Sequence, residues 1–289
     1  MDNIAAHLQK ETGLSMIRIE SILADTKKEY RTYSIPKSTG GRRSVSEPSA
    51  DLKALQRAVL PYIKKPEVNK AASAYESGSS VKKNAERHIK GKHILHMDIK
   101  DFFPSVGRDM FFDTYSGELS VGDAELLWKI VSLDGGLPIG AATSPFIANR
   151  IMAKTDKKLG RLSLSVFLKY TRYADDMIFS SRIRLRQSLA DKIGAIIENA
   201  GFEVNGKKTY FMSARKQVTG IIITDNNELS VGTSYKKQLK KDIYNLLVKN
   251  SGKRGAVRGK YAHLQFIEPE YADTVKKKYI RYDKIGFFK

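Results

Sequence analysis

Acidic side chains interrupt two apolar, strand-like segments of this chain. Asp98 stands near the end of His93–Ile99, and Asp175 and Asp176 stand at the expected turn between two short apolar runs in 166–180. An aspartate at a strand end and an aspartate pair at a hairpin turn can converge on one point, although they are far apart in the sequence. Clustered carboxylates repel one another unless cations hold them, and hard divalent ions such as Mg²⁺ prefer oxygen ligands.

The chemistry that such a cluster supports is phosphoryl displacement. Two divalent ions about 3.5–4 Å apart would stabilise both the attacking and the leaving oxygen of an in-line reaction. We therefore predict Asp98, Asp175 and Asp176 as the catalytic, metal-binding acids of a nucleotidyl transfer. Each signal is weak alone, because Asp175 and Asp176 could form an ordinary polar turn and Asp98 could cap a strand.

The overall charge points to a polyanionic partner. The chain has 51 Lys and Arg against 31 Asp and Glu, a formal net charge of +20. A protein this basic gathers nucleic acid, because each neutralised phosphate releases condensed counterions. A basic protein without such a partner, or one that meets anionic lipid, is the alternative.

Composition narrows the class of protein further. Hydrophobic residues make up 41% of the chain and charged residues 28%, which is typical of a globular protein. The absence of cysteine excludes a disulfide framework and a thiolate metal site. Apolar runs such as Ile221–Ile223 are too short to cross a bilayer, and the N-terminus lacks the apolar core of a signal peptide. We expect a cytoplasmic protein with no membrane partner.

Hydrophobic periodicity predicts the elements that position the acids. Strands are expected in 93–99 and, as a pair, in 166–180, and hairpins in 30–45 and 216–231. Helices are expected up to about Ala24 and in 51–63, 123–133, 145–159 and 189–197, with Ser49 capping the second of them.

The last part of the chain is a separate basic region. Residues 233–289 contain fifteen Lys and Arg and only five Asp and Glu. We expect a helical lobe here, with Lys236, Lys237, Lys240 and Lys241 on one helix that meets phosphates. A solvated charged face is the alternative. The predicted domains are therefore 1–92, 93–232 and 233–289.

Four segments, in order, resemble the motifs of reverse transcriptases. They are Asp98–Ser105, Leu137–Pro145 with Asn149, Tyr173–Asp176, and Gly201-Phe202 through Lys208-Thr209. Two more, Asn84–His88 and Val218–Gly220, resemble signatures of retron reverse transcriptases. The sequence departs from the family pattern at Ile139, where Gln is common, and at Ala142, where Pro is common.

The resemblance implies an α+β fold shaped as a right hand. It would consist of fingers, a palm whose antiparallel sheet packs on helices, and a small helical thumb. The implied reaction is RNA-directed DNA synthesis from dNTPs with Mg²⁺, or Mn²⁺ as an alternative.

The resemblance also implies roles for single residues. The metal site would include the backbone carbonyl of Ile99, whereas Asp101 is expected outside it. The residues expected to bind the dNTP are Arg43, Lys37, Phe103, Gly140 and Lys208. Phe103 would exclude a 2′-hydroxyl sterically, whereas Phe102 is expected in the core.

A third group is expected near RNA or the primer. It comprises Asn84, His88, Val218, Thr219 and Gly220. For Asn84 and His88 we expect a structural or RNA-contacting role, and a general-acid site is the alternative because the pKa of histidine lies near neutrality. Gly220 could serve packing alone.

The retron resemblance extends to the product. It implies a cognate structured non-coding RNA, priming from an internal guanosine 2′-hydroxyl, and a branched RNA–DNA hybrid (msDNA). It further implies anti-phage defence with a separate effector protein. The alternatives are a reverse transcriptase like those of group II introns, or a non-catalytic RNA-binding scaffold with this fold.

Overall fold

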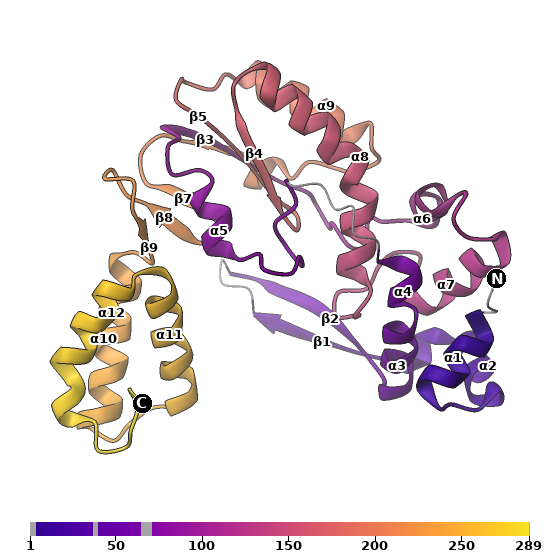
Figure 1. Cartoon of the computed structure of the whole chain (residues 1–289), viewed down its shortest axis with the longest axis horizontal. Coiled ribbons are helices and arrows are strands. Elements are labelled where there is room, and N and C mark those ends of the chain that lie inside the picture. Colours follow the sequence, from indigo (N-terminus) through magenta and orange to yellow (C-terminus); the bar gives the residue numbers. More distant parts are fainter. Residues whose placement is uncertain (1–3, 37–39, 65–70, 289) are drawn as a thin grey trace.

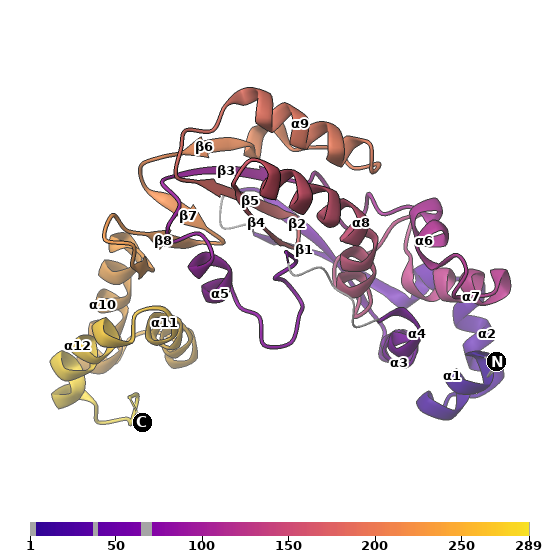
Figure 2. The same ribbon diagram turned by 45° about the horizontal axis from the view of Figure 1, so that its top comes forward.

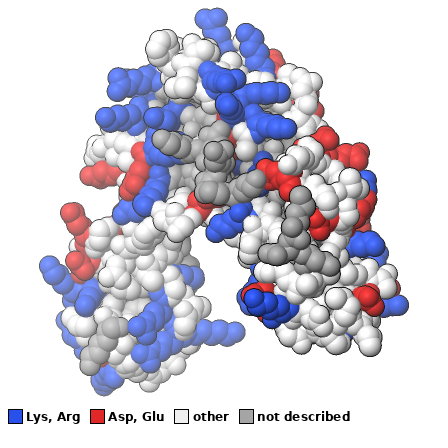
Figure 3. Space-filling model, turned by 45° about the vertical axis from the view of Figure 1, so that its right-hand side comes forward, with Lys and Arg blue, Asp and Glu red and all other residues white. Residues whose placement is uncertain are grey.

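The computed structural model describes residues 4–36, 40–64 and 71–288. Figure 1 shows a palm at the centre and top, fingers with the N-terminus at the right, and a helical thumb at the lower left. The space-filling view shows a hollow between the thumb and the rest of the molecule, with Lys and Arg side chains on both sides of it (Figure 3).

The palm is a four-stranded antiparallel sheet in the order β4–β5–β3–β6. Its strands are β3 (His93–Asp98), β4 (Lys169–Tyr173), β5 (Asp176–Ser181) and β6 (Tyr210–Met212). The long helix α8 (Ser144–Ser165) and α9 (Gln187–Glu198) cover one face (Figure 2). Because side chains alternate along a strand, Leu95 and Met97 enter the core under these helices, and His96 and Asp98 face the other side.

A small sheet and one helix pack at the end of that second face. They are β7 (Lys216–Val218), β8 (Ile221–Ile223), β9 (Leu229–Ser230) and α5 (Val81–Glu86). Their buried side chains form one cluster with Ile94 of β3 and Ile178 of β5. The predicted hairpin in 216–231 is therefore a three-stranded sheet with two turns.

The fingers combine a hairpin with helices. The hairpin is β1 (Tyr30–Pro36) and β2 (Arg42–Pro48), in the register Tyr30↔Pro48. The helices are α1 (Ile4–Thr12), α2 (Met16–Ala24), α3 (Ala50–Ala58), α4 (Leu60–Ile63), α6 (Arg108–Tyr115) and α7 (Val121–Val131), and short 3₁₀ turns lie at Thr26–Glu29 and, in the palm, Gly206–Lys208. Fingers and palm share one core, so a boundary at residue 92 stays a prediction.

Two predicted helices are each divided in the structure. The N-terminal stretch breaks at Gly13, whose φ of +69° is a left-handed conformation that suits glycine. The stretch 51–63 breaks at Val59, and Pro61 begins a new turn. The predicted cap is confirmed, because Ser49 Oγ accepts from Leu52 N at 3.2 Å.

The thumb has a core of its own. It consists of α10 (Thr233–Val248), α11 (Arg254–Ile267), α12 (Pro269–Tyr279) and a 3₁₀ turn at Ile280–Tyr282. Leu239, Ile243, Leu264 and Phe287 are among its buried residues. The expected basic helical lobe is present. Among the described residues, no helix is both long and apolar enough to span a membrane.

Candidate active site

Three carboxylates meet at one end of the palm sheet. Strand register places Asp98 of β3 opposite Asp176 of β5, and Asp175 lies in the turn between β4 and β5. One oxygen of each carboxylate lies within 4.8 Å of the others. In residues 4–36, 40–64 and 71–288, this aspartate cluster is the only group of at least three Asp, Glu or His side chains close enough to share a metal ion.

Asp98 is the most enclosed of the three, with 1% of its surface exposed. Its Oδ1 accepts from Asn205 Nδ2 at 2.9 Å, and its Oδ2 accepts from Lys208 Nζ at 2.8 Å. Partial burial lowers the pKa of Lys208, but the bond to Asp98 and the negative charges of the three aspartates together outweigh this, and the net shift is upward. Lys208 therefore stays charged and balances part of the negative cluster.

Asp175 carries the strongest sign of electrostatic crowding. Burial, followed by the charges of Asp176 and Asp98, raises the pKa of Asp175 to about 6. A cation among the carboxylates would relieve both the repulsion and the lost hydration. The donor set, three carboxylates that share one space, fits a hard divalent metal ion.

Asp176 is held by a histidine that the sequence did not single out. His96 Nε2 lies 3.2 Å from Asp176 Oδ1, and His96 Nδ1 lies 2.8 Å from the carbonyl oxygen of Lys208. The ring stacks on Tyr210 of β6, with centroids 4.8 Å apart. Burial alone would lower the pKa of His96, but the two hydrogen bonds and the charges of Asp176 and Asp98 together raise it above its ordinary value.

The turn itself is held from beneath by a buried ion pair. Arg172 Nη2 donates to Asp156 Oδ2 at 2.7 Å, and both side chains are 0% exposed. Arg172 Nη1 also donates to Asn149 Oδ1 and to the carbonyl of Ala174, each at 3.0 Å. Ala174 has a φ of +57°, unusual for a residue with a Cβ, and its carbonyl bond to Arg172 helps to fix this conformation.

An aromatic pair lies beside the cluster. The ring of Phe103 lies 6.3 Å from that of Tyr75, which sequence reasoning missed. Burial, followed by the negative charge of Asp175, raises the pKa of Tyr75, whereas Arg43 opposes the shift. The ring contact and the two charges therefore place Phe103, Arg43 and Asp175 around Tyr75, next to the aspartate cluster.

Gly140 makes a close approach to the fingers. Its φ is +121°, and a Cβ there would meet the carbonyl oxygen of Ser46 at 2.6 Å. Ser46 N donates to the neighbouring carbonyl of Ile139 at 2.8 Å, so this segment is seated on β2. In the structure, the backbone of Gly140 closely approaches strand β2. Its contact with a nucleotide stays a prediction.

Several further predictions fall in the same part of the palm. Ile99 N donates to the carbonyl of Asp175 at 3.2 Å, and the metal contact of the Ile99 carbonyl is untested. Asp101 is exposed and lies outside the cluster, as expected. Phe102 is 4% exposed, which confirms its place in the core. Lys37 lies outside the described residues.

Asn84 and His88 are both 0% exposed. His88 Nδ1 and Nε2 each lie 2.7 Å from a hydroxyl, of Ser180 and Thr171 respectively. Burial above all lowers the pKa of His88 to about 3, so the ring is neutral. RNA contact is therefore corrected for these two side chains, because the structure leaves them no surface, and the structural role is supported. A buried, neutral His88 does not support the general-acid alternative.

The segment Val218–Gly220 forms the tight turn between β7 and β8. Thr219 and Gly220 have φ of +46° and +84°, and Val218 is fully buried. Asn84 Nδ2 donates to Thr219 Oγ1 at 3.5 Å, so the two segments that resemble retron signatures lie against each other. A side-chain contact of Val218 with the primer is excluded by its burial, whereas Thr219 and Gly220 stay candidates.

Lys236 is engaged inside the protein. Its ammonium pairs with Glu268 and lies 4.3 Å from the ring centroid of Tyr271. Glu268 Oε1 also accepts from Ser230 Oγ and Val231 N, at 2.9 and 2.7 Å. Glu268 therefore joins the thumb to β9, and its pairing with Lys236 corrects the prediction of Lys236 as a free phosphate contact. Lys237 and Lys241 are exposed and Lys240 is half-buried, consistent with such contacts.

An antiparallel palm sheet with three clustered aspartates, between fingers and a basic helical thumb, defines a nucleotidyl-transferring polymerase. The chain matches a family model described as reverse transcriptase (RNA-dependent DNA polymerase) over residues 35–224. It is 30% identical to the Retron Ec86 reverse transcriptase of Escherichia coli, over 94% of this chain and 89% of that protein. It is also 30% identical to the Retron Ec83 reverse transcriptase of Escherichia coli, over 86% of each chain.

A more distant curated relative is the Retron Mx162 reverse transcriptase of Myxococcus xanthus, 29% identical over 92% of this chain and 64% of that protein. Among solved structures, telomerase from Candida albicans in complex with a TWJ fragment of telomeric RNA matches with a TM-score of 0.50. At 12% identity, over 94% of this chain and 62% of that one, this likeness shows the fold alone. The chain belongs to the reverse transcriptase family, and within it to the retron reverse transcriptases. It is an RNA-directed DNA polymerase.

Sequence reasoning missed the groups that support the acids. Arg172, Asp156 and His96 were overlooked because charged residues in a palm strand or helix are usually exposed. Arg172 did offer one signal, because it lies within strand β4, two residues before Ala174 of the turn. Tyr75 offered no local signal, since it lies in an irregular segment.

Proposed function

We propose that this enzyme copies part of its own cognate structured non-coding RNA into single-stranded DNA and forms a branched RNA–DNA hybrid (msDNA). The observation that supports this proposal is the contact of Asn84 with Thr219. It joins the two segments that resemble retron signatures into one feature beside the thumb. The names of the relatives, all retron reverse transcriptases, support it further.

The proposed cofactor is Mg²⁺, with Mn²⁺ as an alternative. Asp98, Asp175 and Asp176 would hold it, with the carbonyl of Ile99. When bound, the metal supplies Lewis-acid activation of the primer hydroxyl and charge stabilisation at the α-phosphate. Asn205 and Lys208 hold Asp98 in place, and His96 orients Asp176.

The proposed dNTP site lies beside the cluster. Phe103 would lie beneath the sugar and exclude a 2′-hydroxyl, with Tyr75 as the ring next to it. Arg43 would bind the triphosphate, because a guanidinium offers paired donors to phosphate oxygens. Lys208 would exchange Asp98 for the departing pyrophosphate, and Gly140 would keep the segment next to the nucleotide close to β2.

Further proposals concern the biological setting. Priming would start from an internal guanosine 2′-hydroxyl, and Lys237, Lys240 and Lys241 would bind the phosphates of template and product. Thr219 and Gly220 would lie near the primer end. The system would act in anti-phage defence with a separate effector protein. Its proposed location is the cytoplasm, where dNTPs and the RNA are made.

Expression with the flanking genomic RNA tests the proposed product. Nucleic acid extracted with the protein should contain a DNA of fixed length that resists RNase, is destroyed by DNase and remains joined to RNA. Asp175→Asn serves as the matched control and should yield none. A DNA that is not joined to RNA would contradict branched priming. RNA binding without DNA in either protein would favour the non-catalytic scaffold.

A further inference from the structure

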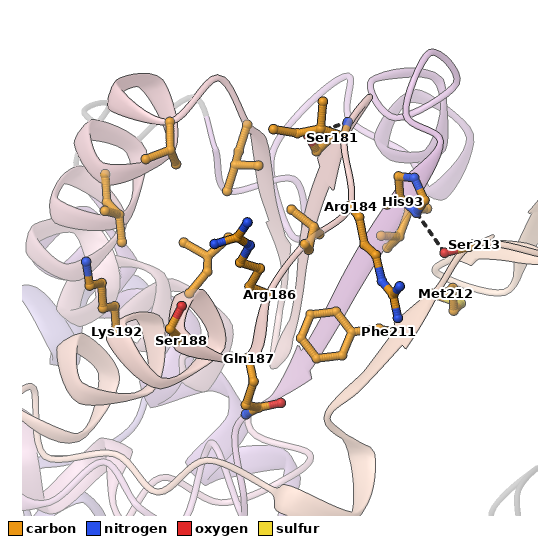
Figure 4. A pocket seen from close by; sticks show the side chains of 17 residues that line it. His93, Ser181, Arg184, Arg186, Gln187, Ser188, Lys192, Phe211, Met212 and Ser213 are labelled. Atoms are coloured by element: carbon orange, nitrogen blue, oxygen red, sulfur yellow. Dashed lines mark hydrogen bonds between the residues drawn. The ribbon is translucent and has the colours of Figure 1, made fainter.

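A cavity of about 1150 Å³ opens at the far end of the palm sheet from the aspartate cluster (Figure 4). Its walls come from the end of α8, the connection from β5 to α9, and β6. The side chains that line it include Leu162, Leu168, Leu185, Leu189 and Phe211. At about 3.3 Å per residue, the length of β3 separates this opening from Asp98 by roughly 17 Å.

The cavity and the aspartate cluster also use opposite faces of the sheet. Neighbouring residues of β6 point to opposite sides, and Tyr210 stacks on His96 beside the cluster. Phe211 pairs with Leu95, whose side chain lies in the core under α8 and α9. Phe211 therefore enters the helix-covered side, and the cavity is separate from the polymerase site.

Large apolar side chains stand in solvent on the segments that form this opening: Ile183 lines it, and Leu164 and Phe167 lie between lining residues in the sequence. Phe167 is 93% exposed, Leu164 76% and Ile183 72%. Phe167 has a φ of +56°, held by bonds from its own amide to Leu164 O and from Leu168 N to Ser163 O. These two bonds are those of a helix C-cap, which places a left-handed residue after the last turn of α8, and the ring at this position is left in water. Exposed apolar groups gathered around a cavity mark an interaction surface.

The rim of the same surface is basic. Arg182, Arg184, Arg186 and Lys192 are exposed, and Figure 4 shows the last three around the opening. Within the part of the chain that the structure describes, none of these four cations forms a salt bridge. The local acid Asp191 accepts instead from Gln187 Nε2 at 2.9 Å. The rim is therefore complementary to a carboxylate-bearing partner.

The walls favour a protein over a nucleic acid. Bases are bound on flat ring faces or through hydrogen bonds to their edges, and the apolar part of this lining, which is mainly aliphatic with one phenylalanine ring, offers few of either. Aliphatic walls suit the apolar anchors of a peptide, and a basic rim suits acidic residues beside those anchors.

We propose that this docking surface binds an acidic amphipathic segment of a partner protein. The surface comprises the cavity, its lining residues Ile183, Arg184, Arg186 and Lys192, and the neighbouring Leu164 and Phe167. Apolar side chains of the segment would enter the cavity, and its carboxylates would meet Arg184, Arg186 and Lys192. The proposal does not depend on which RNA the polymerase copies.

The test uses the full chain and a random peptide library displayed on phage. Peptides are selected on the wild-type protein and counter-selected on the double variant Phe167→Ser/Ile183→Ser. Both side chains are largely in solvent, so this variant should fold, and primer extension on an RNA template should be unchanged. We expect enrichment of peptides that combine large apolar residues with Asp and Glu.

A synthetic consensus peptide then measures the contributions. Its affinity should fall about tenfold or more on the double variant, and likewise on Arg184→Glu/Arg186→Glu. The same peptide with Gln and Asn in place of its acids should bind the wild type correspondingly less. The proposal is overturned if no enrichment depends on the surface, or if the enriched peptides lack acids. Loss of binding of a short single-stranded RNA in both double variants would overturn it, because the surface would then bind RNA. It would also be overturned if the surface served only to pair two copies of this chain.

Discussion

Two buried polar networks hold the β4–β5 hairpin, one on each face of the palm sheet. On the helix-covered face, Arg172 pairs with Asp156 of α8. On the opposite face, His88 bridges the hydroxyls of Thr171 and Ser180. The first network is charged, and the second is neutral.

The difference between the networks follows from what each one positions. The charged network also holds the carbonyl of Ala174, so it fixes the turn that carries Asp175, next to the other two carboxylates. The neutral network anchors the segment that follows α5, a helix packed against β7 and β8, and no charge is needed there. An ion pair thus fixes the turn at the active site, whereas neutral hydrogen bonds hold the hairpin against the segment after α5.

Acid should weaken the neutral network. Burial lowers the pKa of His88 to about 3, while the unfolded chain keeps a value near 6.5. The stabilisation by neutral His88 is therefore complete above pH 6.5 and is lost as the pH falls toward 3. We expect the preference of the unfolded chain for protonated His88 to lower the free energy of unfolding by about 1.4 kcal/mol per pH unit below 6.5, roughly 4–5 kcal/mol over the whole range. Urea unfolding at a series of pH values measures this, with His88→Gln as control. An unchanged pH slope in the variant would contradict the account.

Removing one partner should break the charged network. Asp156→Ala leaves Arg172 buried and unpaired, which should lower the free energy of unfolding by about 3–5 kcal/mol. The double variant Asp156→Leu/Arg172→Met should regain most of that stability, measured by urea unfolding. Primer extension should stay impaired, because the Ala174 carbonyl has lost its donor. Full activity in the double variant would mean that the pair serves packing alone.

His96 holds the candidate metal ligand Asp176 from the side of the sheet opposite the charged network. His96→Ala should weaken divalent-metal binding about 10–100-fold, because a partner that orients a ligand is lost. Titration with Mn²⁺ measures this effect. Tyr210→Leu removes the stacked ring but keeps the hydrogen bonds of His96, and it should change the affinity far less. Equal losses in the two variants would show that His96 acts through packing.

The aspartate cluster should also bind metal in competition with protons. The pKa of Asp175 is raised to about 6, so this carboxyl is ionised above that pH and protonated below it. Metal affinity should be nearly constant above pH 7 and fall about tenfold per pH unit below 6. Calorimetric titrations across this range would reveal it, and a flat profile down to pH 5 would contradict the crowding of the carboxylates.

The smallest effect is expected at the hairpin turn. The Asn84–Thr219 hydrogen bond is 3.5 Å long, and Asn84 Oδ1 has no partner among the described residues. Thr219→Val should therefore change the free energy of unfolding by no more than about 1 kcal/mol. Thermal unfolding measures this, with Thr209→Val, which loses a 3.0 Å bond to Asn205, as comparison. A larger loss at Thr219 would show that the turn is held more tightly than its geometry indicates.

The sequence was most informative where chemistry and local pattern coincide. The positions of Asp98, Asp175 and Asp176 at a strand end and a turn follow from short-range alternation, and the structure brings all three together. The fingers hairpin, the cap at Ser49 and the helical thumb also follow from local signals.

Long-range pairing was beyond such reasoning. Nothing local shows that Arg172 is buried against Asp156, or that Lys236 is tied to Glu268 rather than free for phosphates. The edge strand β6 has only three residues and is defined by its pairing with β3, so its pattern is too short to detect. Burial of His88 likewise depends on two hydroxyls on neighbouring strands.

The most direct test of the central claim is dNTP incorporation on a primed RNA template by the purified chain. The account predicts synthesis that requires a divalent cation and that falls about a thousandfold or more in Asp175→Asn, since such an ion contributes several kcal/mol to the transition state. Asp101→Asn, at the exposed acid outside the cluster, should retain nearly full activity. Synthesis without a divalent cation, or equal activity in Asp175→Asn and the wild type, would contradict the account.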